Sequence, residues 1–124
     1  MDIRDIKKLV LEGETDILEF KKKANFPEKI VKEIVAFANT RGGRLLIGVD
    51  DDGTVTGVKN YEEDIYSLNE AITNYCIPSI KYQLDVVKMN EKRAVLHYNI
   101  YESKDKPHYV KDDYQGKNRK SYLR

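Results

Sequence analysis

The sequence predicts an α+β fold, in which a mixed, largely antiparallel sheet packs with about three helices. Three segments carry apolar residues at helical spacing, and the remaining apolar segments are short and bounded by Gly, Pro or Asp. The chain has 124 residues, of which 40% are hydrophobic and 35% are charged. This length and composition suit one hydrophobic core, so we expect residues 1–124 to form a single domain.

The first three elements follow from local patterns. Residues 2–13 have helical apolar spacing, with aspartates near the start and Gly13 as a natural stop. Residues 16–21 form a short apolar segment that predicts a strand. Residues 27–40 predict the clearest helix of the chain, because Pro27 suits a first helical turn and the apolar residues form one broad face.

A buried strand is predicted next, at residues 44–50, after two glycines that end the helix. Gly48 within this strand is expected to let another segment approach closely. The Asp52-Gly53 pair predicts a hairpin turn, and residues 54–58 are expected to return as a second strand.

The second half of the chain predicts one helix and then four strands. The helix covers residues 61–76 and Pro78 ends that region. The strands are predicted at residues 80–89, 94–101, 108–111 and 121–124. The last of these is short and stops abruptly, so we expect the domain to be the N-terminal part of a longer protein, with further domains C-terminal to Arg124.

Several classes of protein are excluded by composition. No apolar run approaches the roughly 20 residues that span a bilayer, and the charged start of the chain is not a signal peptide. Cys76 is the only cysteine, so neither an internal disulfide nor a CxxC metal clip is possible. These features predict a cytoplasmic protein without a membrane partner.

The glycines of the central block do not form a known phosphate or calcium loop. A Walker A loop needs Lys and Ser/Thr directly after its glycine, whereas Arg44 and Leu45 follow Gly43. A dinucleotide fingerprint opens a helix, whereas these glycines close one. If Gly53 were position 6 of a calcium loop, positions 1 and 12 would be glycine and lysine, which supply no carboxylate.

The charge of the chain is uneven. The net charge is +1, but residues 103–124 carry seven basic and three acidic side chains, and the rest is mildly acidic. Such a basic tail region suits a polyanion, although a solvated pair of strands has the same composition.

One long block has the features of a known family. It begins with Glu14, Glu19, Phe20 and Lys21 in "GETDILEFKKK" and continues as "IVAFANTRGGRLLIGVDDDGTVTGV", and the tail adds "KPHYVK" and "SYLR". Together these segments resemble the Schlafen AlbA_2 family of nucleic-acid-binding domains. The resemblance implies an α+β fold, a DNA or RNA ligand, and a role as the N-terminal module of bacterial transcriptional regulators.

The resemblance also implies a possible catalytic site. In the eukaryotic Schlafen branch, two glutamates and an aspartate form a metal-dependent endoribonuclease site. The matching positions are Glu14, Glu19 and either Asp50 or Asp51, with Asp50 preferred because it ends the strand. Such carboxylates suit Mg²⁺ or Mn²⁺, which can activate water, and no other cofactor is expected.

The spacing of the two glutamates leaves this site open. They are five residues apart, so an extended strand places them on opposite faces, and they converge only if Glu14 lies in a turn before the strand. Glu19 can instead form an ion pair with Lys21 or Arg44.

Nucleic acid is bound chiefly by cations that contact phosphates. We predict these to be Lys21, Lys23, Arg41, Arg44, Lys104, Lys106, Lys111, Arg119 and Arg124. Tyr109, Tyr114 and Tyr122 are interleaved with the C-terminal cations and can either stack on unpaired bases or fill the core. His108 is either a general base or an ordinary strand residue.

Three functions are therefore considered. The first is a nucleic-acid-binding domain that acts through a basic surface in transcriptional regulation. The second is a metal-dependent endoribonuclease, and the third is a protein-interaction or dimerisation module, in which the domain is a homodimer.

Overall fold

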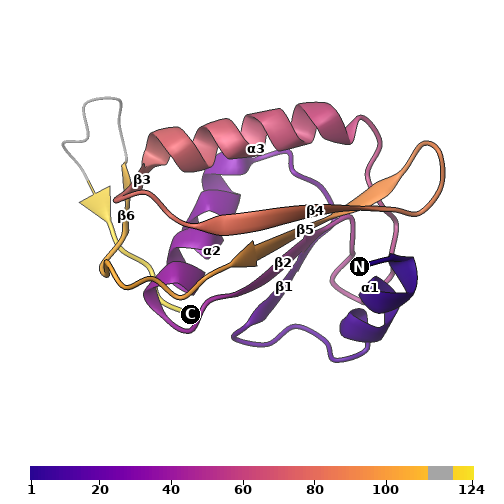
Figure 1. Ribbon diagram of the computed structural model, residues 1–124, viewed down its shortest axis with the longest axis horizontal. Coiled ribbons are helices and arrows are strands. Elements are labelled where there is room, and N and C mark those ends of the chain that lie inside the picture. The colour runs from indigo at the N-terminus through magenta and orange to yellow at the C-terminus, as the bar shows by residue number, and fades with distance from the viewer. Residues whose placement is uncertain (112–118) are drawn as a thin grey trace.

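A computed structural model describes residues 1–111 and 119–124 and shows an α+β fold, as predicted (Figure 1). The main sheet has the strand order β1-β2-β5-β4, in which β1 and β2 are parallel and the other neighbours are antiparallel. Its strands are β1 (Leu18–Lys21), β2 (Gly43–Ile47), β4 (Tyr82–Lys88) and β5 (Ala94–Ile100). A smaller antiparallel sheet consists of β3 (Cys76–Ile77), β6 (Tyr109–Lys111) and β7 (Arg119–Lys120).

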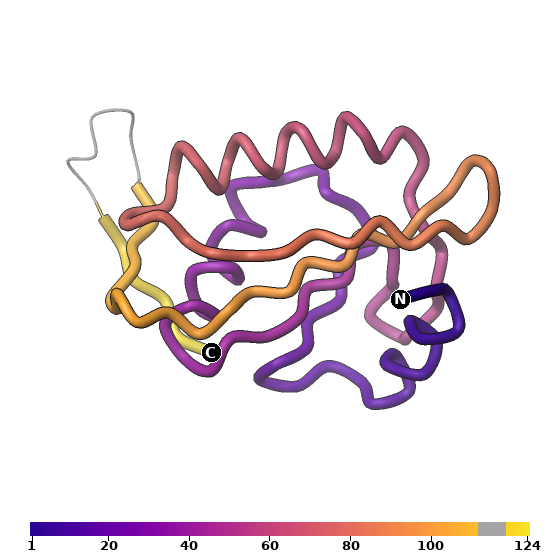
Figure 2. The backbone as a smooth tube through the Cα atoms, viewed as in Figure 1, coloured from indigo at the N-terminus to yellow at the C-terminus, as the bar shows by residue number. Residues whose placement is uncertain are grey.

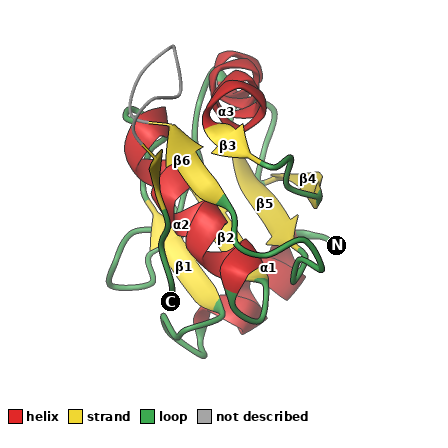
Figure 3. Ribbon diagram, turned by 90° about the vertical axis from the view of Figure 1, so that its left-hand side faces the viewer, coloured by secondary structure: helices red, strands yellow, loops and turns green. Residues whose placement is uncertain are grey.

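Helices cover both faces of the main sheet (Figures 1 and 3). The two longer helices, α2 (Pro27–Asn39) and α3 (Tyr61–Tyr75), pack on one face together with Leu45 of β2. The short helix α1 (Ile3–Val10) packs on the other face with Leu46 of β2. The alternation of neighbouring side chains along β2 therefore divides the core into two clusters. No helix in the described part of the chain is both long and apolar enough to cross a membrane.

The start of α1 confirms the predicted helix and explains its aspartates. The Asp2 side chain accepts hydrogen bonds from the backbone N–H groups of Arg4 and Asp5, and the Asp5 side chain accepts one from the Asp2 N–H. This reciprocal arrangement is a capping box, which satisfies donors that the first helical turn leaves without partners.

A tight turn joins α2 to β2. Gly42 has φ +74°, and a side chain there would place its Cβ 2.6 Å from the carbonyl oxygen of Ile100. Its N–H donates to the carbonyl oxygen of Phe37, which ends the helix. The turn therefore requires glycine for both conformation and space.

The predicted second strand at residues 54–58 is wrong. Only isolated bridges form there, between Val49 and Val55 and between Val58 and Ala94. Gly48 and Gly57 both have positive φ and their backbones lie in contact, which ends β2 at Ile47 instead of at residue 50. The expected close approach at Gly48 and the turn at Asp52-Gly53 are confirmed.

The predicted strand at residues 121–124 is also wrong. The pairing with β6 occurs earlier, at β7, and the last four residues leave the ladder. Their polar groups contact Asn39 instead, whose side-chain amide donates to the Ser121 hydroxyl and to the Tyr122 carbonyl. Figure 2 shows the result, with the C-terminus beside the turn between α2 and β2.

Candidate functional site

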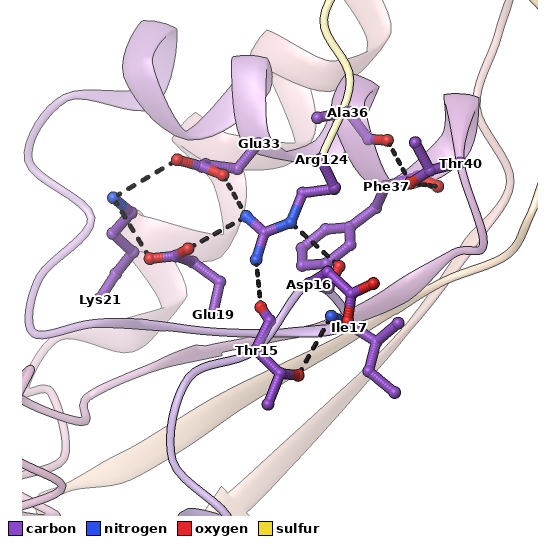
Figure 4. A network of polar contacts seen from close by, with 10 residues as sticks. All are labelled: Thr15, Asp16, Ile17, Glu19, Lys21, Glu33, Ala36, Phe37, Thr40 and Arg124. Atoms are coloured by element: carbon purple, nitrogen blue, oxygen red, sulfur yellow. Dashed lines mark hydrogen bonds and ion pairs between the residues drawn. The ribbon is translucent and has the colours of Figure 1, made fainter.

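The C-terminal residue Arg124 is built into the domain (Figure 4). One terminal nitrogen donates to Glu19 Oε1 at 3.0 Å and to Glu33 Oε2 at 2.5 Å. The other two nitrogens donate to the carbonyl oxygens of Thr15 and Asp16, and the guanidinium lies 4.2 Å from the centre of the Phe37 ring. Because its side chain is only 11% exposed, Arg124 serves as a structural tie between the last residue, β1 and α2.

Glu19 is consequently surrounded by cations. Lys21 lies on the same face of β1 and approaches both Glu19 and Glu33 to 4.0 Å, while Arg124 bridges the same two carboxylates. The expected ion pair between Glu19 and Lys21 is thus present in the structure. Glu19, Lys21, Glu33 and Arg124 thus form a compact charge cluster between β1 and α2.

Glu14 lies next to this cluster and has an unusual acidity. Partial burial, a hydrogen bond with Glu19 and the nearby charges of Glu19 and Asp51 raise the pKa of Glu14 to about 7, against the opposing effect of Lys21. Glu14 precedes β1, in the segment before the strand begins, and this position lets its side chain reach Glu19. The two glutamates therefore do converge.

The raised pKa predicts that replacing Glu14 with glutamine stabilises the domain at high pH. Deprotonation is harder in the folded than in the unfolded protein, so the native protein loses stability as the pH rises from 4.5 to about 7. Glutamine removes this loss. Because the Glu14 side chain is exposed, solvent screening reduces the effect, and we expect about 1 kcal/mol at pH 8 and no difference below pH 4.5. Urea unfolding at both pH values measures it, and equal stability of the two proteins at pH 8 contradicts it.

The two aspartates that follow β2, Asp50 and Asp51, interact with different residues. Asp51 is the one whose charge acts on Glu14, whereas Asp50 lies 3.5 Å from Lys22 and accepts a hydrogen bond from the Asp51 N–H. Among residues 1–111 and 119–124, no group of three His, Cys, Asp or Glu side chains is placed to hold a metal ion. The carboxylates of Glu14, Glu19, Asp50 and Asp51 are therefore not arranged as a ligand set for Mg²⁺ or Mn²⁺. Nuclease activity stays a prediction, which intact RNA after incubation with Mn²⁺ would contradict.

The predicted phosphate-binding cations do not gather into one surface. Arg41 pairs with Asp16, and Lys106 pairs with Glu102 at 2.8 Å, in addition to the pairs of Lys21 and Arg124. Arg44 and Lys104 are exposed but line separate hollows, of about 350 and 290 Å³. The other predicted positions are Lys111 on β6, Arg119 on β7 and Lys23 after β1.

A different set of cations lines one connected surface, which we call the basic groove. Its largest hollow, of about 650 Å³, lies between the segment after β1, the loop before α3 and the β4–β5 turn. This hollow shares Lys23 with a smaller one at the start of α2, and it shares Lys59 and Arg93 with a third at the β4–β5 turn. The main cations of the groove are Lys23, Lys29, Lys59, Lys92 and Arg93.

The groove cations are available to a ligand. Lys23, Lys29, Lys59 and Lys92 are exposed and form no ion pair with a carboxylate in the described part of the chain. Arg93 is half-buried and donates to the carbonyl oxygens of Thr56 and Gly57. These two contacts are to neutral carbonyl groups, so they leave the charge of Arg93 in place.

Acids also line the groove, with Glu63 and Asp64 in the largest hollow and Glu91 in the hollow at the β4–β5 turn. Partial burial and the neighbouring charge of Glu63 raise the pKa of Asp64, which lines the largest hollow. A lysine paired with Asp64 would lower that pKa instead. No lysine of the groove is among the causes that shift the pKa of Asp64.

Sequence analysis missed Lys29, Lys59, Lys92 and Arg93. Lys59 comes from the loop before α3, Lys92 and Arg93 come from the β4–β5 turn, and Lys29 is in the first turn of α2. Each segment contains only one or two cations, so none forms a local run. Only the fold brings them together, and the sole signal in the sequence was Lys23 of the "KKK" run.

The two histidines have structural positions. His108 is 1% exposed, and its ring nitrogens contact the Pro78 carbonyl at 2.8 Å and the Ser103 hydroxyl at 2.5 Å. His97 is buried beside Asp85, and burial is the main cause that lowers its pKa. Tyr122 packs against the core and Tyr109 is half-buried on β6, whereas Tyr114 lies outside the described residues.

Comparison with known proteins identifies relatives of this chain. The family model "Schlafen, AlbA_2" matches residues 14–124. The N-terminal domain of a RecG-related protein of Nitrosomonas europaea, whose description names an ATP-dependent DNA helicase, has a similar structure with a TM-score of 0.72 and 18% identity. That match covers 100% of this chain and 90% of the other.

A second solved structure is also similar. The DIP2311 protein of Corynebacterium diphtheriae matches with a TM-score of 0.55 and 20% identity. The match covers 92% of this chain but 24% of that protein, so the present chain spans about a quarter of its length. At these identities both structures support the fold alone.

Proposed function

Because this chain belongs to the Schlafen AlbA_2 family, we propose that it is a nucleic-acid-binding domain and that the basic groove holds the sugar-phosphate backbone. The observation that carries this proposal is the row of five cations along three adjoining hollows, none of which forms an ion pair with a carboxylate among the described residues. The RecG-related protein, whose description names a DNA helicase, shares the fold of this chain.

The chemistry of the groove fits phosphates better than bases. Four of its five main cations are lysines, which act as point charges and read no base pattern. Each phosphate neutralised by a cation releases counter-ions, so binding must weaken with salt. With about five such contacts, we expect the affinity to fall by about 100-fold for a single strand, and by about 500-fold for duplex DNA, between 50 and 200 mM salt. Binding is therefore expected to be largely independent of sequence.

Charge reversal in the groove tests this function. We expect the Lys23→Glu, Lys59→Glu, Lys92→Glu triple variant to bind labelled DNA or RNA about 30-fold more weakly at 50 mM salt, with a shallower salt dependence. All three side chains are exposed and form no ion pair with a described carboxylate, so the fold should be unaffected. Fluorescence anisotropy at two salt concentrations measures the affinity, and thermal unfolding checks the fold.

A matched control separates the groove from net charge. The Lys7→Glu, Lys81→Glu, Lys88→Glu triple variant changes the net charge equally at exposed positions outside the groove. It should lose less than about threefold in affinity. Equal losses in both variants would contradict the assignment of the groove, and a wild-type protein that binds nothing at low salt would contradict the function itself.

We also propose the finer role that accompanies this activity. The domain would serve as a DNA-associated module of a bacterial, cytoplasmic transcriptional regulator. Two comparisons support a modular role, because the RecG-related structure is an N-terminal domain and the DIP2311 protein is about four times as long as this chain. Light scattering of the purified domain tests whether it is a homodimer.

A further inference from the structure

One aromatic side chain in the basic groove is largely exposed. Phe26 is 56% exposed, although it lies directly before Pro27 at the start of α2. It lines the smallest of the three hollows, of about 190 Å³, with Lys21, Lys23 and Lys29. A phenylalanine surrounded by cations on the surface leaves apolar area in water without burying it elsewhere.

The setting of Phe26 matches the requirements of base stacking. Proteins that bind single strands combine cations along the backbone with aromatic rings on which bases stack. No carboxylate lines the hollow around Phe26, and that hollow joins the largest one through Lys23 and Asn25. A strand that follows the groove therefore passes the ring.

Lys29 lies where it can contact either the Phe26 ring or a phosphate of a bound strand. Its ammonium lies 5.0 Å from the centre of the Phe26 ring. Such a cation–π contact is weak at an exposed site. Because the lysine is exposed, it can leave the ring when a base takes its place and then contact a phosphate of the same strand.

We propose that Phe26 stacks on one unpaired base and that the basic groove consequently prefers single-stranded nucleic acid to duplex. The proposal rests on the function assigned to the groove above. In a duplex, both faces of each base are covered by neighbouring base pairs, so the ring has no base to stack on without unpairing. A single strand offers both its phosphates and a base at the same site.

The test compares a single-stranded oligonucleotide with a blunt duplex of the same length by anisotropy at 50 mM salt. We expect the wild-type protein to bind the single strand at least about tenfold more tightly, since stacking on one aromatic ring is worth about 1–3 kcal/mol per base. Phe26→Ala should lose about tenfold on the single strand and little on the duplex, with an unchanged salt dependence. Phe26→Tyr, which keeps an aromatic ring, should restore most of the affinity.

A spectroscopic signal distinguishes stacking from other effects. A 2-aminopurine in the strand should be quenched on binding to the wild-type protein and much less on binding to Phe26→Ala. Tyr66→Ala is the matched control, because Tyr66 is an exposed aromatic on α3, outside the groove. It should change neither affinity nor quenching. Thermal unfolding should show Phe26→Ala as stable as the wild type, because the ring is exposed.

The outcomes separate this inference from the function on which it rests. Equal, salt-dependent binding of single strand and duplex, with no effect of Phe26→Ala, overturns the stacking role and leaves the groove as a phosphate-binding surface. Equal losses on both ligands in Phe26→Ala also overturn it. A wild-type protein that binds neither ligand at low salt overturns the proposed function as well.

Discussion

Replacing Arg124 with alanine is expected to lower the free energy of unfolding by about 3 kcal/mol. The guanidinium bridges Glu19 and Glu33, donates to two carbonyl oxygens and packs on the Phe37 ring. Its removal leaves two neighbouring carboxylates without their main counter-ion. The melting temperature should fall by about 10 °C in a domain of this size, as measured by calorimetry or circular dichroism.

Two variants define the cause of this loss. Arg124→Lys keeps the charge but not the planar set of donors, so about half the loss should remain. Arg4→Ala removes an arginine whose side chain is 84% exposed in its ion pair with Asp2, and it should change stability by less than about 0.5 kcal/mol. If Arg124→Ala is as stable as Arg4→Ala, the C-terminal arginine is not a structural tie.

Replacing Asn39 with alanine is expected to have a similarly large effect, also about 3 kcal/mol. Asn39 is 8% exposed, and its carbonyl oxygen accepts the His108 N–H at 2.7 Å. Its amide donates to the carbonyl oxygens of His108 and Tyr122 and to the Ser121 hydroxyl. Alanine removes the hydrogen-bond partner of these groups where α2, β6 and residues 121–124 meet. Buried polar groups without a partner lower the free energy of unfolding.

Asn74→Ala provides the matched control. Asn74 is exposed on α3 and makes one 3.3 Å hydrogen bond, to Glu70. Because alanine also favours the helix, this change should cost less than about 0.5 kcal/mol. Chemical denaturation of both variants compares them directly, and equal midpoints would show that the four hydrogen bonds of Asn39 contribute little.

Local patterns were sufficient to predict most of the fold. The capping aspartates, Pro27 and the apolar spacing each act within a few residues, so the three helices could be located from the chain alone. The errors occurred where distant contacts determine the backbone. The contact between Gly48 and Gly57 prevents the second strand of the expected hairpin, and Asn39 draws residues 121–124 out of the small sheet.

The candidate site was harder to predict for the same reason. The cations were predicted from their local density in the sequence. Several of them instead form ion pairs with acids that are remote in the chain, as Arg124 does with Glu19. Lys59, Lys92 and Arg93 come from separate turns and converge only in three dimensions. The convergence of Glu14 with Glu19 required Glu14 to precede the strand, and the spacing of the two residues left that question open.

The contacts of Arg124 with β1 and α2 have a consequence for folding during synthesis. A ribosome releases β1 and α2 long before it adds the arginine that neutralises Glu19 and Glu33. While the nascent chain grows, the early elements can collapse on their apolar faces, but these two carboxylates remain without their last counter-ion. These contacts therefore cannot form until Arg124 has left the exit tunnel.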